Sequence, residues 1–168
     1  MVLIQLLFAC TLSKAPLKAQ NDTTLFVVSA RDDLDTRTTS SLPSSLEQAI
    51  ENKIQSRGIS LTILPLKEEF SMLRTSAQRQ ALYEPRPLLL IETKAQFFSQ
   101  LNGRFRWTVD VQLHLLAQSG TPFVQQFSVP VFHQFHHERE AEALEAAQEV
   151  ILRHVDILLD DYIRGGTL

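Results

Sequence analysis

Three histidines close together are the residues that come nearest to a chemical site in this chain. His133, His136 and His137 stand within five positions of the stretch VFHQFHHERE, and Glu138 follows them directly. Imidazole and carboxylate groups are common zinc ligands, and a catalytic zinc binds three of them while one position stays open for water. A metal-dependent hydrolase is therefore one hypothesis for this stretch.

The pattern around the histidines favours a structural explanation. His133 ends a run of alternating apolar residues that predicts a strand, whereas a shared face with His136 would need both residues on a helix. The acidic residues that follow suit the first turn of a helix, where they face the positive end of its dipole. The H-E-x-x-H pattern of zinc hydrolases is missing. We therefore assign no metal to the chain and keep His133, His136 and His137 only as candidate ligands.

Other catalytic patterns are also missing from the sequence. No serine stands in a G-x-S-x-G elbow, and neither a P-loop nor a G-x-G-x-x-G turn occurs. The paired acids Glu68-Glu69 and Asp160-Asp161 fit solvated helix surfaces better than a catalytic pair. The single cysteine, Cys10, rules out an internal disulfide and a cysteine-rich zinc site. We expect a protein that acts by binding and not by turnover, without a catalytic residue or a cofactor.

Two arginines beside aromatic residues are the best candidates for a binding site. Arg104 and Arg106 flank Phe105 and Trp107 directly after an Asn-Gly turn signal. Guanidinium groups form paired hydrogen bonds with phosphate and stack on aromatic rings, so this pattern suits a phosphate or sugar-phosphate ligand. An ordinary basic turn is the simpler alternative. The formal net charge is −3 and no basic stripe stands out, so we expect no nucleic-acid partner.

The first 19 residues are typical of an export leader. The run MVLIQLLFACTL is apolar and has the length of a signal-peptide core, and small and polar residues follow it. The tetrapeptide LFAC resembles a loose bacterial lipobox, in which the cysteine, here Cys10, receives a lipid and becomes the new N-terminus. Cleavage after Ala19 is one alternative, and a buried first element of a cytosolic protein is another. The basic start of a signal is missing, so either the leader 1–19 is truncated or this run is not a signal.

The first half of the chain predicts two strands and two helices. A β-rich run at 25–28 is followed by a polar loop over 31–41. Ser44 and Glu47 match the S-x-x-E capping box, and apolar residues at helical spacing follow until Gly58 ends the helix. The other two elements of this half are a strand at 59–64 and a helix at 66–83.

The second half predicts an antiparallel meander and a long helix. Every second residue from Phe105 to Leu115 is apolar, which is the pattern of a strand with one buried face. The Asn102-Gly103 pair predicts the tight turn before this strand. From about Glu138 the apolar spacing changes to three and four residues, which predicts a helix of about 22 residues. The other strands of the meander are expected at 88–98 and 123–131.

These elements define the expected fold. Residues 20–168 are predicted to form a single α+β domain in the order β-α-β-α-β-β-β-α. Its mixed or antiparallel sheet would be covered on one face by two or three helices, and the polar face of the meander would meet solvent or a partner. No apolar run is long enough to cross a bilayer as a helix.

From Pro43 onward the chain resembles the lipopolysaccharide-assembly lipoproteins of Gram-negative outer membranes. The resemblance is one of pattern and order, and it covers most of residues 25–163. Its successive parts are SLEQAIENKIQSRGISLTIL, PLLLIETKAQFF, RFRWTVDVQLHLLAQSG, FSVPVFHQF and EALEAAQEVILRHVDILLDDY. The helix predicted at 66–83 and the imperfect lipobox depart from the family. Both also fit a neighbouring group, the envelope lipoproteins and secretion-channel subunits with an anticodon-binding-like domain.

The resemblance implies a function without catalysis. Members plug and support a large β-barrel that inserts lipopolysaccharide into the outer leaflet. For this chain it implies an outer-membrane location facing the periplasm, a membrane-anchoring lipid on Cys10, and contacts from Arg104 and Arg106 to the phosphates of lipopolysaccharide. The neighbouring group implies instead an oligomeric subunit of a secretion or polysaccharide-export channel. A cytosolic α+β module without an envelope role is the remaining alternative.

Overall fold

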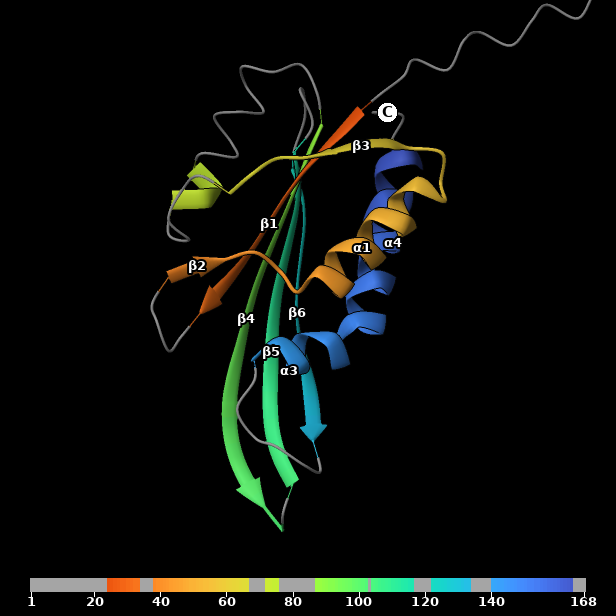
Figure 1. The fold of residues 1–168 in the computed structure, drawn as a ribbon. Helices are drawn as coiled ribbons and strands as arrows, with labels where there is room; N and C mark the ends of the chain where they lie inside the picture. The colour runs from red at the N-terminus through yellow and green to blue at the C-terminus, as the bar shows by residue number, and fades with distance from the viewer. Residues whose placement is uncertain are drawn as a thin grey trace, which may run out of the picture.

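The structure, a computed structural model, is a single sheet with helices packed on one face (Figure 1). It describes residues 24–33, 38–66, 72–75, 87–102, 104–116, 122–133 and 140–164. The strands are β1 Thr24–Asp33, β2 Thr38–Ser40, β3 Ser60–Ile63, β4 Leu88–Leu101, β5 Arg104–Leu116 and β6 Phe123–His133. The helices are α1 Ser44–Gln55, α3 Glu140–Ala146 and α4 Gln148–Arg164. The predicted α+β class is confirmed, and α1, α3 and α4 cover one face of the sheet (Figure 1).

The sheet mixes parallel and antiparallel pairs. Its strand order is β2-β1-β4-β5-β6, and β3 also pairs with β1. Strand β1 runs parallel to β3 and β4, while β4, β5 and β6 form the predicted antiparallel meander. Because β1 and β4 are parallel, the start of β1 lies at the opposite end of the sheet from the β4–β5 turn.

The sequence of β5 explains why the meander is long and regular. Its core-facing residues are buried from Trp107 to Leu115 at every second position, and the residues between them face the other side of the sheet. The strand pairs with β4 from Leu88↔Leu116 to Leu101↔Arg104, with one bulge near Phe97. A two-residue turn joins the two strands, and Asn102 has the positive φ of 50° that such turns require.

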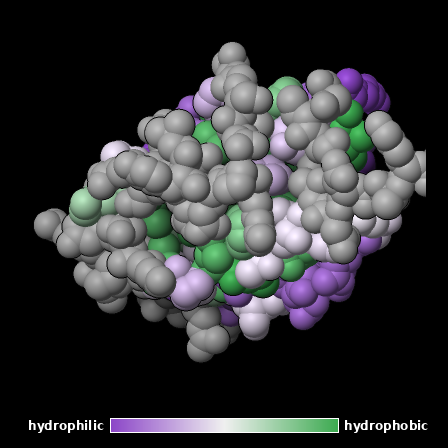
Figure 2. All heavy atoms as spheres, turned by 90° about the horizontal axis from the view of Figure 1, so that it is seen from above, coloured by the Kyte–Doolittle hydropathy of each residue, from purple (hydrophilic) through white to green (hydrophobic). Residues whose placement is uncertain are grey.

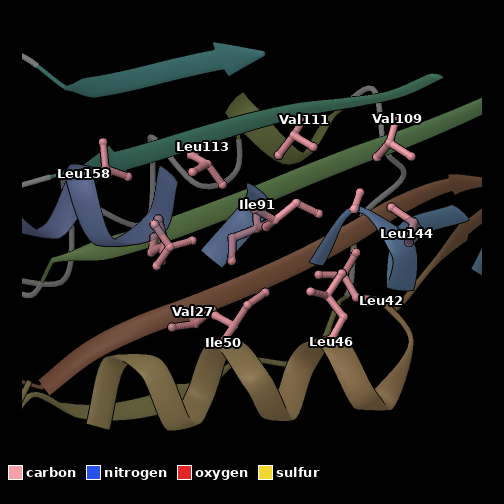
Figure 3. Close-up of a cluster of buried hydrophobic side chains, with 14 of the residues drawn as sticks. Val27, Leu42, Leu46, Ile50, Ile91, Val109, Val111, Leu113, Leu144 and Leu158 are labelled. Carbon is pink, nitrogen blue, oxygen red and sulfur yellow. The ribbon is translucent and has the colours of Figure 1, made fainter. Parts of the chain in front are cut away.

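The main core lies between the sheet and the helices (Figure 3). Ile91 of β4 and Val111 of β5 are fully buried against Ile50 of α1, Leu144 of α3 and other helix residues. Each aliphatic side chain buried in this way stabilises the fold by about 1.5–3 kcal/mol. The alternation of β5 therefore sets which face of the sheet receives the helices.

A second, smaller apolar cluster lies on the opposite face of β1 and β4. Leu73, in the short helical turn described at 72–75, packs there with buried residues of these strands. The cluster consists of Phe26, Val28, Ala30, Leu73, Leu88, Leu90 and Leu116. This part of the second face is therefore covered, and most of the predicted helix at 66–83 lies outside the described residues.

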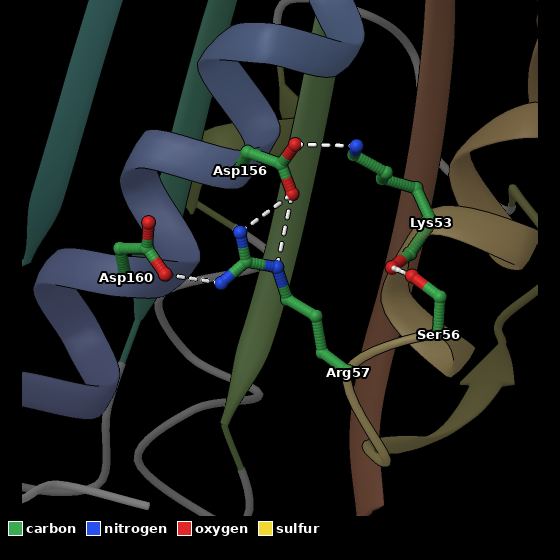
Figure 4. A network of polar contacts seen from close by, with 5 residues as sticks. All are labelled: Lys53, Ser56, Arg57, Asp156 and Asp160. Carbon is green, nitrogen blue, oxygen red and sulfur yellow. Dashed lines mark hydrogen bonds and ion pairs between the residues drawn. The ribbon is translucent and has the colours of Figure 1, made fainter.

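Polar contacts join α1 to α4 (Figure 4). Lys53 Nζ lies 2.5 Å from Asp156 Oδ2, and Arg57 Nη2 lies 2.8 Å from Asp156 Oδ1. Arg57 also binds Asp160 one turn further along α4. Ion pairs therefore cross the outer side of the helix layer, where the hydrophobic core ends.

Both ends of α1 differ in part from the capping pattern in the sequence. The predicted capping box is wrong, because Pro43 holds the cap position without a side-chain hydrogen bond and Ser44 is already helical. The Glu47 carboxylate instead accepts a hydrogen bond of 2.6 Å from the Ser29 hydroxyl of β1. Gly58 ends the turn after the helix with φ +73°, a conformation that favours glycine.

Two further boundaries were wrong in the sequence analysis. The predicted loop over 31–41 contains the end of β1 and the short strand β2, which pair as Arg31↔Ser40 to Asp33↔Thr38. The single long helix expected from Glu138 begins at Glu140 in the described residues and is divided at Ala147 into α3 and α4. The backbone hydrogen bond from Ala147 to Ala143 still links the two parts.

The surface is partly hydrophobic and partly hydrophilic at the end of the molecule where β3 and the last turn of α4 lie (Figure 2). Seen from this side, hydrophobic residues show between hydrophilic ones (Figure 2). Ile63 of β3 and Ile163 of α4 are both partly exposed. Among the described residues, no helix combines the length and the hydropathy that a bilayer span requires.

Candidate functional site

The β4–β5 hairpin extends past the helices (Figure 1). Aromatic and basic side chains gather at its end. The hairpin is long because β5 keeps its alternating pattern beyond the part that the helices cover, and β4 pairs with it as far as Leu101. We call this end of the sheet the tip, and it consists of Phe97, Phe98, Asn102, Arg104, Phe105, Arg106 and Phe132. Arg104 and Arg106, the predicted binding residues, both belong to it.

On the face turned away from the helices, Arg106 lies between two phenylalanines. Its Cζ atom is 5.2 Å from the ring centroid of Phe98 and 5.5 Å from that of Phe132. The three side chains come from neighbouring strands, since Arg106 is opposite Phe132 on one side and next to the β4 bulge on the other. A guanidinium group between two rings gains from cation–π attraction, which also holds it in place.

On the face turned toward the helices, the tip continues the aromatic packing. The ring of Phe97 lies 5.6 Å from Trp107, edge to face, and 6.3 Å from Phe105. Trp107 is buried, whereas half of Phe97 is exposed. The core therefore ends at Trp107, and the rings beyond it reach solvent.

The tip is unusually apolar for an exposed surface. Phe98 is 70% exposed, Phe132 57% and Phe97 50%. Scattered exposed hydrophobic residues are ordinary, but several large rings gathered in one place indicate an interaction site. An open depression of about 500 Å³, lined by Asn102, Arg104, Arg106 and Phe132, lies beside them.

The electrostatics of the tip favour an anion. Both arginines are exposed, and the sequence from residue 97 to residue 109 contains no acidic side chain. Exposed guanidinium groups keep their charge and offer paired donors that match phosphate or carboxylate. A ligand that combines an anionic group with an apolar part would match the whole tip.

The two arginines of the tip were predicted from the sequence, whereas its exposed phenylalanines were not. Phe132 stands on the outward-facing set of β6 positions, which otherwise holds two polar residues, a valine and a proline but no other aromatic ring. Phe97 and Phe98 are consecutive, so one ring must stand on each face of the strand near its end. An aromatic ring on the outward side of a strand was therefore the available signal.

Of the three candidate metal ligands, the structure describes only His133, whose backbone lies at the edge of the tip. His133 ends β6, with its backbone opposite Phe105, while His136 and His137 lie outside the described residues. In the described part of the chain, no three histidine, cysteine or acidic side chains gather as metal ligands would. Cys10 and the leader 1–19 also lie outside the described residues, so these assignments stay predictions.

A second polar cluster lies further along the sheet, around a buried acid. Glu92 is 3% exposed, Arg74 Nε lies 2.7 Å from its Oε2 atom, and His114 Nε2 lies 3.3 Å from the same oxygen. Arg74 also donates to Gln112. Burial alone would raise the pKa of Glu92, but His114 and Arg74 outweigh it and leave that pKa below 4.5. The cluster fixes Arg74 to the sheet, which is a structural role.

Comparisons with known proteins give only a distant likeness. No family model matches the chain, and no curated protein matches its sequence. The chain is similar to the solved structure of the rare lipoprotein B from Shewanella oneidensis, with a TM-score of 0.44 and 8% identity, over 86% of this chain and 96% of that one.

Two further solved structures are also distantly similar. Lipoprotein GNA1162 from Neisseria meningitidis has a TM-score of 0.45 and 10% identity, over 80% of this chain and 99% of that one. A minor lipoprotein from Acinetobacter baumannii has a TM-score of 0.33 and 10% identity, over 87% of this chain and 93% of that one. All three are lipoproteins by name. Their TM-scores are too low to support an argument about function.

Proposed function

We propose that the protein is a non-enzymatic lipoprotein of the cell envelope that binds lipopolysaccharide at its tip. Lipopolysaccharide joins phosphate groups to apolar chains, and the tip offers arginines beside exposed rings. The single observation that carries the proposal is the position of Arg106 between Phe98 and Phe132, with Arg104 exposed beside the same depression. Guanidinium groups would hold the phosphates, and the rings would contact the apolar part.

The remaining parts of the proposal come from the sequence. The lipobox-like end of the apolar leader supports a lipid on Cys10, and the family resemblance supports an outer-membrane location facing the periplasm. The same resemblance supports an outer-membrane β-barrel as the partner that this protein would assist. The sequence lacks the catalytic patterns of common hydrolases and nucleotide-dependent enzymes, which supports a role in binding.

Purification from native membranes in gentle detergent tests the proposal. Mass spectrometry of the purified material should identify a β-barrel protein in stoichiometric amount and lipopolysaccharide beside it. The double variant Arg104→Gln/Arg106→Gln should keep the barrel but lose most of the lipopolysaccharide. The matched control is Arg153→Gln/Arg164→Gln, which removes two exposed charges from α4. Recovery of the protein with copies of itself alone, or from the cytosol alone, would contradict the proposal.

A further inference from the structure

Exposed phenylalanine rings occupy both faces of the tip, which phosphate binding alone does not explain. Phe98 and Phe132 flank Arg106 on the face away from the helices, while Phe97 belongs to the opposite face with Trp107. Each of the three rings is at least half exposed. Exposing rings on both faces of one hairpin costs solubility, so a partner that surrounds the hairpin is expected.

We propose that the tip docks on the surface of an anionic lipid bilayer. Phe97, Phe98 and Phe132 would enter the boundary between headgroups and acyl chains, and Arg104 and Arg106 would contact the lipid phosphates. Apolar rings beside arginines are the composition that holds proteins at this depth of a bilayer. The arginine stems can lie along apolar surface while their charged ends stay among the headgroups.

The shape of the hairpin favours a bilayer over a protein partner. The β4–β5 turn projects beyond the helices, because β4 and β5 run past them and remain paired as far as Leu101 and Arg104 (Figure 1). A protein partner would usually cover one face of such a hairpin, whereas lipid surrounds whatever enters it. The acid-free stretch from residue 97 to residue 109 removes the repulsion that an anionic surface would otherwise exert.

The tip also lies at the opposite end of the sheet from the start of β1, where the described part of the chain begins. Phe26, near the start of β1, pairs with Leu88 at the start of β4, and the tip lies at the other end of that strand. Fourteen strand residues span about 46 Å. The tip can therefore meet a lipid surface without bringing the beginning of the fold to that surface. This inference adds a bilayer to the proposed function and needs neither the β-barrel nor the lipid on Cys10.

The single tryptophan of the chain provides a local measurement. Trp107 lies 5.6 Å from Phe97, so its fluorescence reports on the tip. The experiment uses the full chain with Cys10→Ser, which cannot be lipidated, and vesicles of phosphatidylcholine with or without phosphatidylglycerol. Acyl chains brominated near the headgroup should quench Trp107 in the anionic vesicles and much less in the neutral ones.

Variants at the tip and away from it test whether vesicle binding depends on the rings of the tip. Phe98→Ser and Phe132→Ser should each weaken vesicle binding about tenfold. The free energy gained by burying one phenylalanine ring corresponds to a factor of about ten or more in the dissociation constant. Val124→Ser is the matched control, since Val124 is 54% exposed on the same face of β6. It should change binding by less than about twofold. All three positions are exposed, so unchanged circular dichroism and thermal unfolding should show that the variants fold.

The outcomes distinguish this inference from the proposed function. If vesicles fail to quench Trp107 while the protein still binds lipopolysaccharide micelles, bilayer docking is overturned and the proposed function stands. If inorganic phosphate reproduces the fluorescence change and no brominated lipid quenches it, the tip is a phosphate site and docking is again overturned. Equal losses in Phe132→Ser and Val124→Ser would also overturn the inference, because binding would then not depend on the tip.

Discussion

Arg57, in the turn after α1, lies 2.8 Å from Asp156 of α4 and so ties the two helices together at their outer side. Its hydrogen bond to Asp160 raises the pKa of Arg57 against the opposing effect of burial, and Asp156 adds to the rise. The same contact lowers the pKa of Asp160. The guanidinium is about one quarter exposed, so solvent screens the pair only in part.

Arg57→Met should destabilise the protein by about 1 kcal/mol, because the methionine keeps the apolar stem but loses the ion pair with Asp156. The measurement is the free energy of unfolding in urea at low and at high salt. The loss should shrink at high salt, because screening weakens the pair in the unmodified protein. A loss that is independent of salt would mean that packing, and not charge, explains the effect.

His154 should make the protein less stable at mildly acidic pH. The ring stacks on Phe127 at 3.8 Å, and its Nδ1 atom lies 3.0 Å from Gln125 Oε1. Burial first, and then the charge of Arg153, lower the pKa of His154 below 6.5. The unfolded chain therefore takes up a proton near pH 6.5 while the folded chain does not, so stability is full above that pH and falls below it.

The variant His154→Gln isolates this contribution, because every other histidine remains in place. Urea unfolding of both proteins between pH 7.5 and pH 5.5 is the measurement. The unmodified protein should lose stability relative to His154→Gln as the pH falls. Parallel stability curves for the two proteins would show that the pKa of His154 does not differ between the folded and the unfolded state.

Glu92→Gln should remove a stabilising contribution that is present only above acidic pH. The pKa of Glu92 is below 4.5 in the folded protein, so its contribution is full above pH 4.5 and disappears as the pH falls through the folded value. At pH 6 we expect a loss of about 1–2 kcal/mol, because Arg74 is half exposed and water can replace part of the contact. Thermal unfolding at pH 6 and pH 3 checks this, and an equal loss at both would contradict it.

Ile91→Ala tests the assignment of the main core. Ile91 is fully buried near the start of β4 under the helix layer. Removing its side chain should cost about 2–5 kcal/mol, because lost burial and a new cavity both contribute. Val124→Ala, at an exposed position of β6, should cost less than about 0.5 kcal/mol. Similar losses in the two variants would mean that the faces of the sheet are assigned wrongly.

The alternation of β5 allowed much of the fold to be predicted from the sequence. A period of two over the whole strand fixes which residues face the core, and the Asn102-Gly103 pair fixes where the chain turns. The helices follow from their own apolar spacing. Together these signals predicted the one-sided α+β arrangement and placed Arg104 and Arg106 at the start of the long strand β5.

The parts that could not be predicted depend on contacts between distant residues. Glu47 matches a capping pattern, but Ser29 of β1 binds it in the folded protein. Strand β2 carries no apolar pattern and forms because its backbone pairs with the end of β1. Phe98 and Phe132 meet around Arg106 only because the strand register and the β4 bulge bring them together. Local sequence signals contain none of this information.

The most direct test of the account is the affinity of the protein for lipopolysaccharide. We would measure the dissociation constant of the full chain, of Arg104→Gln/Arg106→Gln, and of the control Arg153→Gln/Arg164→Gln. Charge-assisted hydrogen bonds to phosphate predict that the tip variant binds at least about tenfold more weakly, while the control stays within about twofold. Equal affinities for the tip variant and the control would contradict the claim that the tip is the binding site.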